Sequence, residues 1–290
     1  MEKSMFNFQV DEERCIQCGE CALDCPAGVI TMDGTPKFNE EGGCFRCQHC
    51  LAICPTAAIS ILGKNPDESQ ALAGTFPTAA QMTALIKGRR SVRRYRDEEV
   101  AASLIDELLD TAGHAPTGVN AQNVLFTVVK ERAVMNALRQ EVMERLVKLK
   151  ESGGLPDGFV GQYMGGAVKL WLEEGRDIIF RGAPHLLITS APKTSPCPAQ
   201  DTLIALTTFQ MIAHAHSLGT VWDGMFMMAL SLCPDLAGRI GIPEQHLLGY
   251  AIAFGWPAVE YHRTVQRAPA QVNVVPKSCI PQSASETREV

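Results

Sequence analysis

Eight of the eleven cysteines fall into two short runs with the same spacing. Each run reads Cys-x2-Cys-x2-Cys-x3-Cys-Pro, from Cys15 to Pro26 and from Cys44 to Pro55. This spacing binds 4Fe-4S clusters through thiolates, and where two such runs occur the fourth cysteine of each ligates the other cluster. We therefore expect two clusters, one on Cys15, Cys18, Cys21 and Cys54, the other on Cys44, Cys47, Cys50 and Cys25.

Two other interpretations of these cysteines are zinc sites and a disulfide framework. Zinc also takes four thiolates, but its ligands usually come as Cys pairs and a gap, without a third evenly spaced Cys. Disulfides are typical of small secreted domains, whereas this chain has 290 residues and its start lacks the charged region and apolar core of a signal peptide. We expect clusters, and the segment resembles the two-cluster bacterial ferredoxin family at all eight ligand positions.

A second chemically informative stretch is basic. Six of the ten residues from Lys87 to Arg96 are Lys or Arg. Such a run is often a solvated face or a nucleic-acid patch, but the net charge of −6 and pI near 5.7 favour neither nucleic acid nor an anionic membrane. Arginines donate bidentate hydrogen bonds and Ser91 adds a neutral donor, so the stretch suits a phosphate monoester.

The elements that must hold these residues follow from periodicity and turn signals. We expect a cluster domain over 1–62, a linker over 63–77, a second domain over 78–279 and a disordered tail over 280–290. Thr78 and Gln81 form a capping-box pair. Expected helices lie at 98–113, 131–150, 168–180 and 199–218, and strands at 5–10, 29–32, 58–62, 124–129, 185–190, 246–255 and 270–275. Residues 151–165 are expected to be a mobile glycine-rich excursion, and 219–224 a turn.

Four segments of the second domain, in order, resemble the FMN-dependent nitroreductase family. They are Arg89-Arg90-Ser91-Val92-Arg93, Ala115–Gln122, Trp222-Asp223-Gly224, and Gly255-Trp256-Pro257 followed by Arg267. The resemblance covers residues 78 to 275. It implies an α+β fold, with a ferredoxin-like two-cluster domain ahead of an α/β sandwich whose mostly antiparallel sheet is flanked by helices. It also implies a homodimer with FMN at the subunit interface.

The same resemblance implies the flavin site. The phosphate contacts are Arg89, Arg90, Ser91, Arg93 and Arg267. A loop from the partner subunit contributes Pro116, Thr117, Gly118, Asn120 and Gln122. The segment against the flavin is Val221, Trp222, Asp223 and Gly224.

Flavin carries the chemistry in such a protein, and we find no catalytic triad or reactive-Cys arrangement. We expect electrons to pass from a low-potential donor, reduced ferredoxin or NAD(P)H, through the clusters to FMN, which reduces a small nitroaromatic, quinone or activated alkene. Alternatives are an electron-transfer or sensing flavoprotein without a small substrate, and an NAD(P)H-driven nitroreductase. His214 and His216 lie two apart and cannot share a helix face, so we interpret them as structural. We expect a cytoplasmic protein that binds neither membrane nor nucleic acid.

Overall fold

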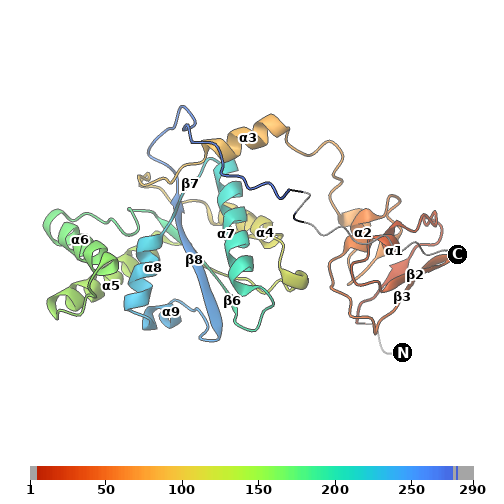
Figure 1. The fold of residues 1–290 in the computed structure, drawn as a ribbon, viewed down its shortest axis with the longest axis horizontal. Helices are drawn as coiled ribbons and strands as arrows, with labels where there is room; N and C mark the ends of the chain where they lie inside the picture. Colours follow the sequence, from red (N-terminus) through yellow and green to blue (C-terminus); the bar gives the residue numbers. More distant parts are fainter. Residues whose placement is uncertain (1–4, 277–278, 280–290) are drawn as a thin grey trace.

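The structure, a computed structural model, describes residues 5–276 and 279 and consists of two folded parts joined by an extended segment (Figure 1). The tail expected to be disordered, 280–290, lies outside the described residues.

The N-terminal part repeats one pattern around each cysteine run. Its strands are β1 (Gln9–Val10) paired antiparallel with β4 (Ile59–Ser60), and β2 (Ile30–Asp33) in a hairpin with β3 (Thr35–Phe38). Its helices are α1 (Glu20–Leu23) and α2 (His49–Ile53), which contain the third cysteine of their runs. Cys21 and Cys50 are buried in one apolar cluster with Leu51, Ile59 and Ile61, so the ligand segments themselves form the core.

The joining segment is only lightly attached to the N-terminal part. It contains one 3-10 turn, η1 (Pro66–Glu68), which Asn65 caps by accepting the Asp67 N–H. Arg14 pairs with Asp67 at 2.8 Å, but both side chains are about half exposed, and exposed pairs contribute little stability. Beyond it, α3 (Ala79–Gly88) begins with the Thr78–Gln81 capping box, which confirms that prediction.

The second part is organised by a four-stranded sheet in the order β5-β6-β8-β7, in which all neighbours pair antiparallel. The strands are β5 (Leu125–Val129), β6 (His185–Pro192), β7 (Gly219–Trp222) and β8 (His246–Gly255). Three of them lie where strands were predicted, at 124–129, 185–190 and 246–255.

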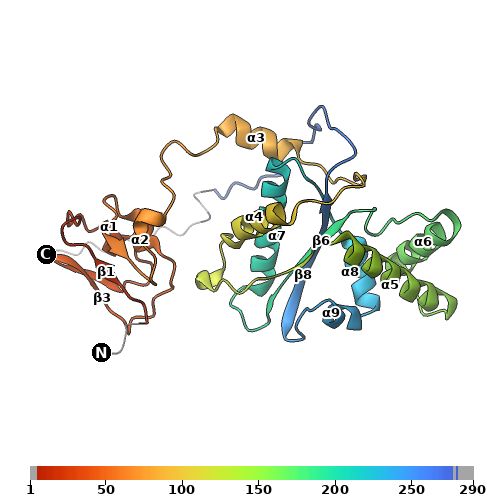
Figure 2. The same ribbon diagram turned by 180° about the vertical axis from the view of Figure 1, so that it is seen from behind.

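Both faces of this sheet are buried. Successive side chains of β6 point to opposite faces of the sheet, so its consecutive apolar residues pack on both sides. Leu186 and Ile188 belong to one apolar cluster, whereas Leu187 between them belongs to the other. The first face is covered by α5 (Arg132–Glu151), α6 (Phe159–Glu174), α8 (Gly224–Leu232) and α9 (Asp235–Arg239), and the second by α4 (Ala102–Gly113) and α7 (Pro198–Ala215). Figures 1 and 2 show these two helix layers on either side of β8.

Several sequence-based boundaries were wrong. The expected excursion at 151–165 is partly helical, because Val160, Met164 and Val168 supply an apolar stripe that outweighs the local glycines, and this helix ends at Glu174 before the predicted 180. The expected turn at 219–224 begins with strand β7, which hydrogen-bonds along β8. The expected strand at 270–275 is an exposed coil.

Candidate functional site

The cysteines surround two cavities in the N-terminal part. The first cysteine cavity is lined by Cys15, Cys18, Cys21 and Cys54, and the second by Cys25, Cys44, Cys47 and Cys50. Each set takes three members from one run and the fourth from the other, the same grouping as in the sequence-based assignment. Among the residues with described placement, no three His, Cys, Asp or Glu side chains converge as ligands of a single metal ion.

The two runs reach this geometry through matching left-handed backbone positions. Gln17 and Arg46, each preceding the second cysteine of its run, have φ of 56° and 54°. Gly19 and Gln48, each following that cysteine, have φ of 79° and 60°. Left-handed conformations are uncommon outside glycine, and their recurrence at equivalent positions wraps both loops around their cavities in the same way.

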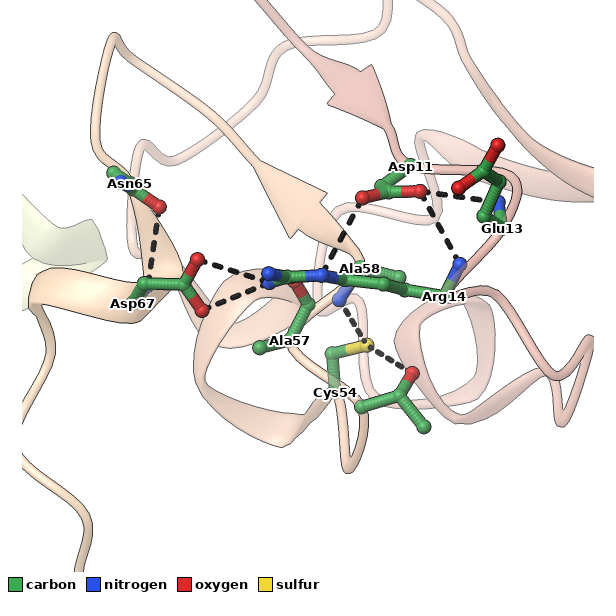
Figure 3. Close-up of polar contacts among 9 residues, drawn as sticks. Asp11, Glu13, Arg14, Cys54, Ala57, Ala58, Asn65 and Asp67 are labelled. Atoms are coloured by element: carbon green, nitrogen blue, oxygen red, sulfur yellow. Dashed lines mark hydrogen bonds and ion pairs between the residues drawn. The ribbon is translucent and has the colours of Figure 1, made fainter.

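Cys54 has the most complete hydrogen-bonding environment among the cysteine sulfurs. Its Sγ accepts the Ala58 N–H at 3.2 Å (Figure 3). The same sulfur lies 3.7 Å from the Thr56 hydroxyl. Burial works to raise the Cys54 pKa, but these donors outweigh it and the pKa is lowered. At Cys50 the Leu51 N–H opposes burial only in part, so burial raises the Cys50 pKa to about 12. Hydrogen bonds to the sulfurs are among the factors that set cluster potential.

The basic stretch and the end of α7 enclose a third cavity, of about 360 Å³, which falls in the size range of small-molecule sites. We call it the arginine cavity. Its polar wall residues are Arg89, Arg90, His214, Ser217, Thr220, Glu260 and Tyr261.

The guanidinium groups at this cavity are arranged for an anion. Burial lowers the Arg89 pKa, and the charges of Arg90 and Arg267 lower it further. Arg89 and Arg90 line the cavity, whereas Arg267 acts on Arg89 only through its charge and is not among the lining residues. The buried Arg90 Nε has no hydrogen-bond partner among the described residues, although Arg90 Nη2 donates to Lys87 O at 2.9 Å. A phosphate would supply both the missing acceptor and the missing negative charge.

The other two predicted phosphate contacts are placed less centrally. Ser91 forms a bridge to Thr220 at the edge of β7, which attaches the basic stretch to the sheet. Arg93 is exposed, donates to Ser91 O at 3.4 Å and is not among the residues that line the arginine cavity.

The predicted flavin loop is a strained, well-anchored turn around η2 (Gly118–Asn120). Val119, Asn120 and Gln122 all have left-handed φ, of 46°, 55° and 50°. The Gly118 N–H donates to Asp201 Oδ1 at 3.0 Å, and the Gln122 N–H donates to Thr117 Oγ1 at 2.9 Å. Strained loops held by their surroundings are typical of functional sites.

This loop does not share the arginine cavity of its own chain. Thr117 and Gln122 line a separate small cavity with Phe126 and Ala205. Pro116 and Gly118 belong to the same turn but line neither cavity. The loop therefore presents its polar groups to a surface other than that of the arginines.

The segment after β7 carries a buried acid. Asp223 caps α8 by accepting the Phe226 N–H at Oδ1, 2.9 Å away, while Oδ2 is buried and has no partner in the described part of the chain. Burial raises the Asp223 pKa to about 7 against the opposing effect of the Phe226 N–H. Next to it, Trp222 Nε1 donates to Gln210 Oε1 at 3.1 Å, and Val221 is buried in the core. Gly224 lies against Tyr250, whose hydroxyl would be 2.8 Å from an added Cβ.

Two features of the site were missed from the sequence. His214 was interpreted as structural, yet it lines the arginine cavity, whereas His216 lies 3.7 Å from Glu107. Asn120 Nδ2 donates to Phe45 O at 3.0 Å and so joins the flavin loop to the second cysteine cavity, which Phe45 lines. Both are contacts between segments distant in sequence, and spacing along the chain carries no signal of them.

Comparison with known proteins follows the same division of the chain. Residues 14–59 match the 4Fe-4S dicluster domain, and residues 86–256 match the nitroreductase family. A protein named NADH dehydrogenase from Thermus thermophilus is 39% identical over 198 residues, covering 65% of this chain and 92% of that protein. Nitroreductase NfnB from Mycolicibacterium smegmatis is 26% identical over 204 residues, covering 63% of this chain and 85% of that protein.

A solved structure shares the fold of the second part. The nitroreductase with bound FMN from Bacteroides fragilis matches with a TM-score of 0.53 at 18% identity, covering 67% of this chain and 99% of that one. Within the part of the chain that the structure describes, none of the helices combines the length and the apolar character needed to cross a bilayer.

Proposed function

The chain belongs to the nitroreductase family and is an FMN-dependent oxidoreductase with a 4Fe-4S dicluster domain ahead of the family domain, and we propose a route for its electrons. The electrons pass from a low-potential donor through two 4Fe-4S clusters to FMN. They then reduce a small electron-poor substrate. The substrate would be a nitroaromatic, a quinone or an activated alkene, because each accepts electrons readily at a ring or conjugated bond.

The cysteine cavities support the two-cluster part of this proposal. Each cavity has four cysteines around it, the ligand number of a 4Fe-4S cluster. One cluster would be held by Cys15, Cys18, Cys21 and Cys54, and the other by Cys25, Cys44, Cys47 and Cys50. A cube of iron and sulfur fills a cavity, whereas zinc needs four thiolates about 2.3 Å from a single point.

The arginine cavity fits the flavin phosphate. Arg89, Arg90 and Arg267 would neutralise it, and Arg90 Nε would gain the acceptor that it lacks among the described residues. The loop with Pro116, Thr117, Gly118, Asn120 and Gln122 lies away from this cavity, which suits a site shared between two subunits, as the family resemblance implies. We therefore propose a homodimer whose loops serve the partner's flavin.

When bound, FMN supplies chemistry that accepts single electrons and gives up electron pairs. The protein binds and orients the FMN and sets the charge around its ring. Val221, Trp222, Asp223 and Gly224 would lie against the flavin, where the raised pKa lets Asp223 keep a proton near neutrality. A neutral carboxyl at that place avoids the repulsion that a carboxylate would exert on an anionic reduced ring.

The observation that carries the electron route is the Asn120–Phe45 hydrogen bond. It brings the second cysteine cavity against the flavin loop, so that the cluster held by Cys44 and Cys47 would be the one next to the flavin. The first cysteine cavity, with exposed Cys18 and Ile16, would face the donor.

The route is tested by anaerobic stopped-flow reduction of the full chain, monitored at the flavin absorbance, with reduced ferredoxin as donor. We expect Cys47→Ser to keep FMN but to lose flavin reduction by ferredoxin, because it removes a ligand of the cluster beside the loop. Flavin reduction at the wild-type rate in Cys47→Ser would refute the route.

Nicotinamide donors are the second candidate, because a relative carries the name NADH dehydrogenase. In the same apparatus NADH and NADPH are offered to wild type and to Cys47→Ser. Equal rapid reduction of both proteins by a nicotinamide, with slow reduction by ferredoxin, would assign the protein to the NAD(P)H-driven alternative.

A further inference from the structure

We propose that His214 belongs to the phosphate subsite of the arginine cavity and takes up a proton when a phosphate monoester binds there. The proposal rests on the proposed function in one respect, that FMN is the ligand of this cavity. It reassigns a residue that sequence spacing alone had suggested to be structural.

The position of His214 comes from the packing of two helix ends. His214 lies in the last turn of α7, and its Nε2 would be 3.7 Å from a Cβ added to Gly88, the last residue of α3. Arg89 and Arg90 follow Gly88 directly and line the same cavity. The imidazole therefore lies beside the C-terminal end of α3, next to the arginines of the cavity wall.

The charges around His214 favour its neutral form while the cavity holds no anion. Burial lowers the His214 pKa, and the charges of Arg89 and Arg90 lower it further. Two further cations belong to the same region: the charge of Arg267 acts on Arg89, and Lys87 lies in the last turn of α3.

Few groups around the cavity raise the His214 pKa against the arginines. Glu260 is the carboxylate in the cavity wall, and Tyr261 is the other titratable group beside it. The C-terminal end of α7 favours a cation in its last turn. Glu107 of α4 pairs instead with His216.

A phosphate dianion in the cavity shifts His214 from its neutral form towards its protonated form. It offsets the charges of Arg89 and Arg90, and it favours the protonated imidazole as an opposite charge nearby. Protonated His214 then donates a charge-assisted hydrogen bond, one of the stronger kinds of contact to phosphate. Binding is therefore coupled to proton uptake, and affinity rises as the pH falls from 8 towards 6.5.

The test is isothermal titration of FMN into the full chain after removal of its flavin, under argon, in buffers of different ionisation enthalpy. The slope of observed heat against buffer enthalpy gives the protons taken up. For wild type at pH 7 to 7.5 we expect net uptake, and for His214→Gln we expect this uptake to disappear. His216→Gln is the matched control, because His216 is two residues away, at the C-cap of the same helix, and is not among the residues that line the cavity.

Affinity provides the second measurement. At pH 6.5 we expect His214→Gln to weaken FMN binding about tenfold, the loss of one hydrogen bond to a charged group. Riboflavin, which has no phosphate, should bind wild type and His214→Gln equally. Because the phosphate itself titrates near pH 6, only differences between variants at one pH are compared. His214→Asn replaces His214→Gln if the latter does not fold.

The outcomes separate this inference from the proposed function. Proton uptake and affinity unchanged in the folded His214 variant, with FMN bound normally, would overturn the inference and leave the proposed function standing. Failure of the wild-type protein to bind FMN would overturn both.

Discussion

Asp223 should make the stability of this protein depend on pH in an unusual direction. Its pKa is raised from 3.8 to about 7 because the carboxyl is buried, so the folded chain holds this proton over a range where the unfolded chain releases it. Below the pKa of the unfolded state the carboxyl is protonated in both states, so its titration does not change the free energy of unfolding. As the pH rises from 4 to 7, the free energy of unfolding falls progressively because only the unfolded chain releases the proton. Above pH 7 both states release it, and the free energy of unfolding falls no further.

The magnitude follows from the difference between the two pKa values. Each unit corresponds to 1.36 kcal/mol at 25 °C, so the full loss is about 4 kcal/mol, and about 3 kcal/mol of it falls between pH 5 and pH 8. Asp223→Asn removes the titrating group and keeps an N-cap acceptor for the Phe226 N–H. The free energy of unfolding of the variant relative to wild type should therefore rise by about 3 kcal/mol over that interval.

The assay is denaturant unfolding of both proteins, with clusters and flavin retained, under argon at several pH values and followed by tryptophan fluorescence. Only the difference between the two proteins at each pH is used, and the two are compared at equal flavin and iron content because Asp223 belongs to the proposed flavin site. Infrared difference spectra provide a direct check, because a protonated carboxyl band that persists above pH 5 in wild type should be absent from Asp223→Asn. A constant difference between the proteins from pH 5 to 8, together with no such band, would refute the reasoning.

Three further changes have defined outcomes. Arg89→Ala should weaken FMN binding about tenfold or more, measured by flavin fluorescence, because it removes a charge-assisted contact; unchanged affinity would remove Arg89 from the phosphate site. Asp177→Ala should lower the unfolding free energy by about 3 kcal/mol, since it removes the carboxylate 2.8 Å from the partly buried Arg139 guanidinium; a melting temperature equal to wild type would contradict this. Gly249→Ala should cost about 1–3 kcal/mol because its Cβ would lie 2.5 Å from Thr202 Cβ. The control Gly113→Ala, in α4 with open space among the described atoms, should stabilise the protein by up to about 1 kcal/mol.

Features that depend on interactions between residues of one short segment could be predicted from the sequence. The repeated spacing of the cysteines determines which thiols can reach a common centre, and the Thr78–Gln81 box starts α3 through hydrogen bonds three residues apart. A run of consecutive apolar residues was enough to predict β6 as a buried strand, and both of its faces are buried. Where two local signals competed, as at the glycines before α6, the sequence-based boundary was wrong.

Contacts across the chain were decided only by tertiary structure. The charge of Arg267 reaches Arg89, and His214 lines the same cavity as Arg89 and Arg90, because α3, α7 and the segment after β8 pack together. The Asn120–Phe45 contact and the buried state of Asp223 arise in the same way. Which residues meet, and how far water is excluded from them, depends on how distant segments fold onto one sheet, and spacing along a single segment does not encode that.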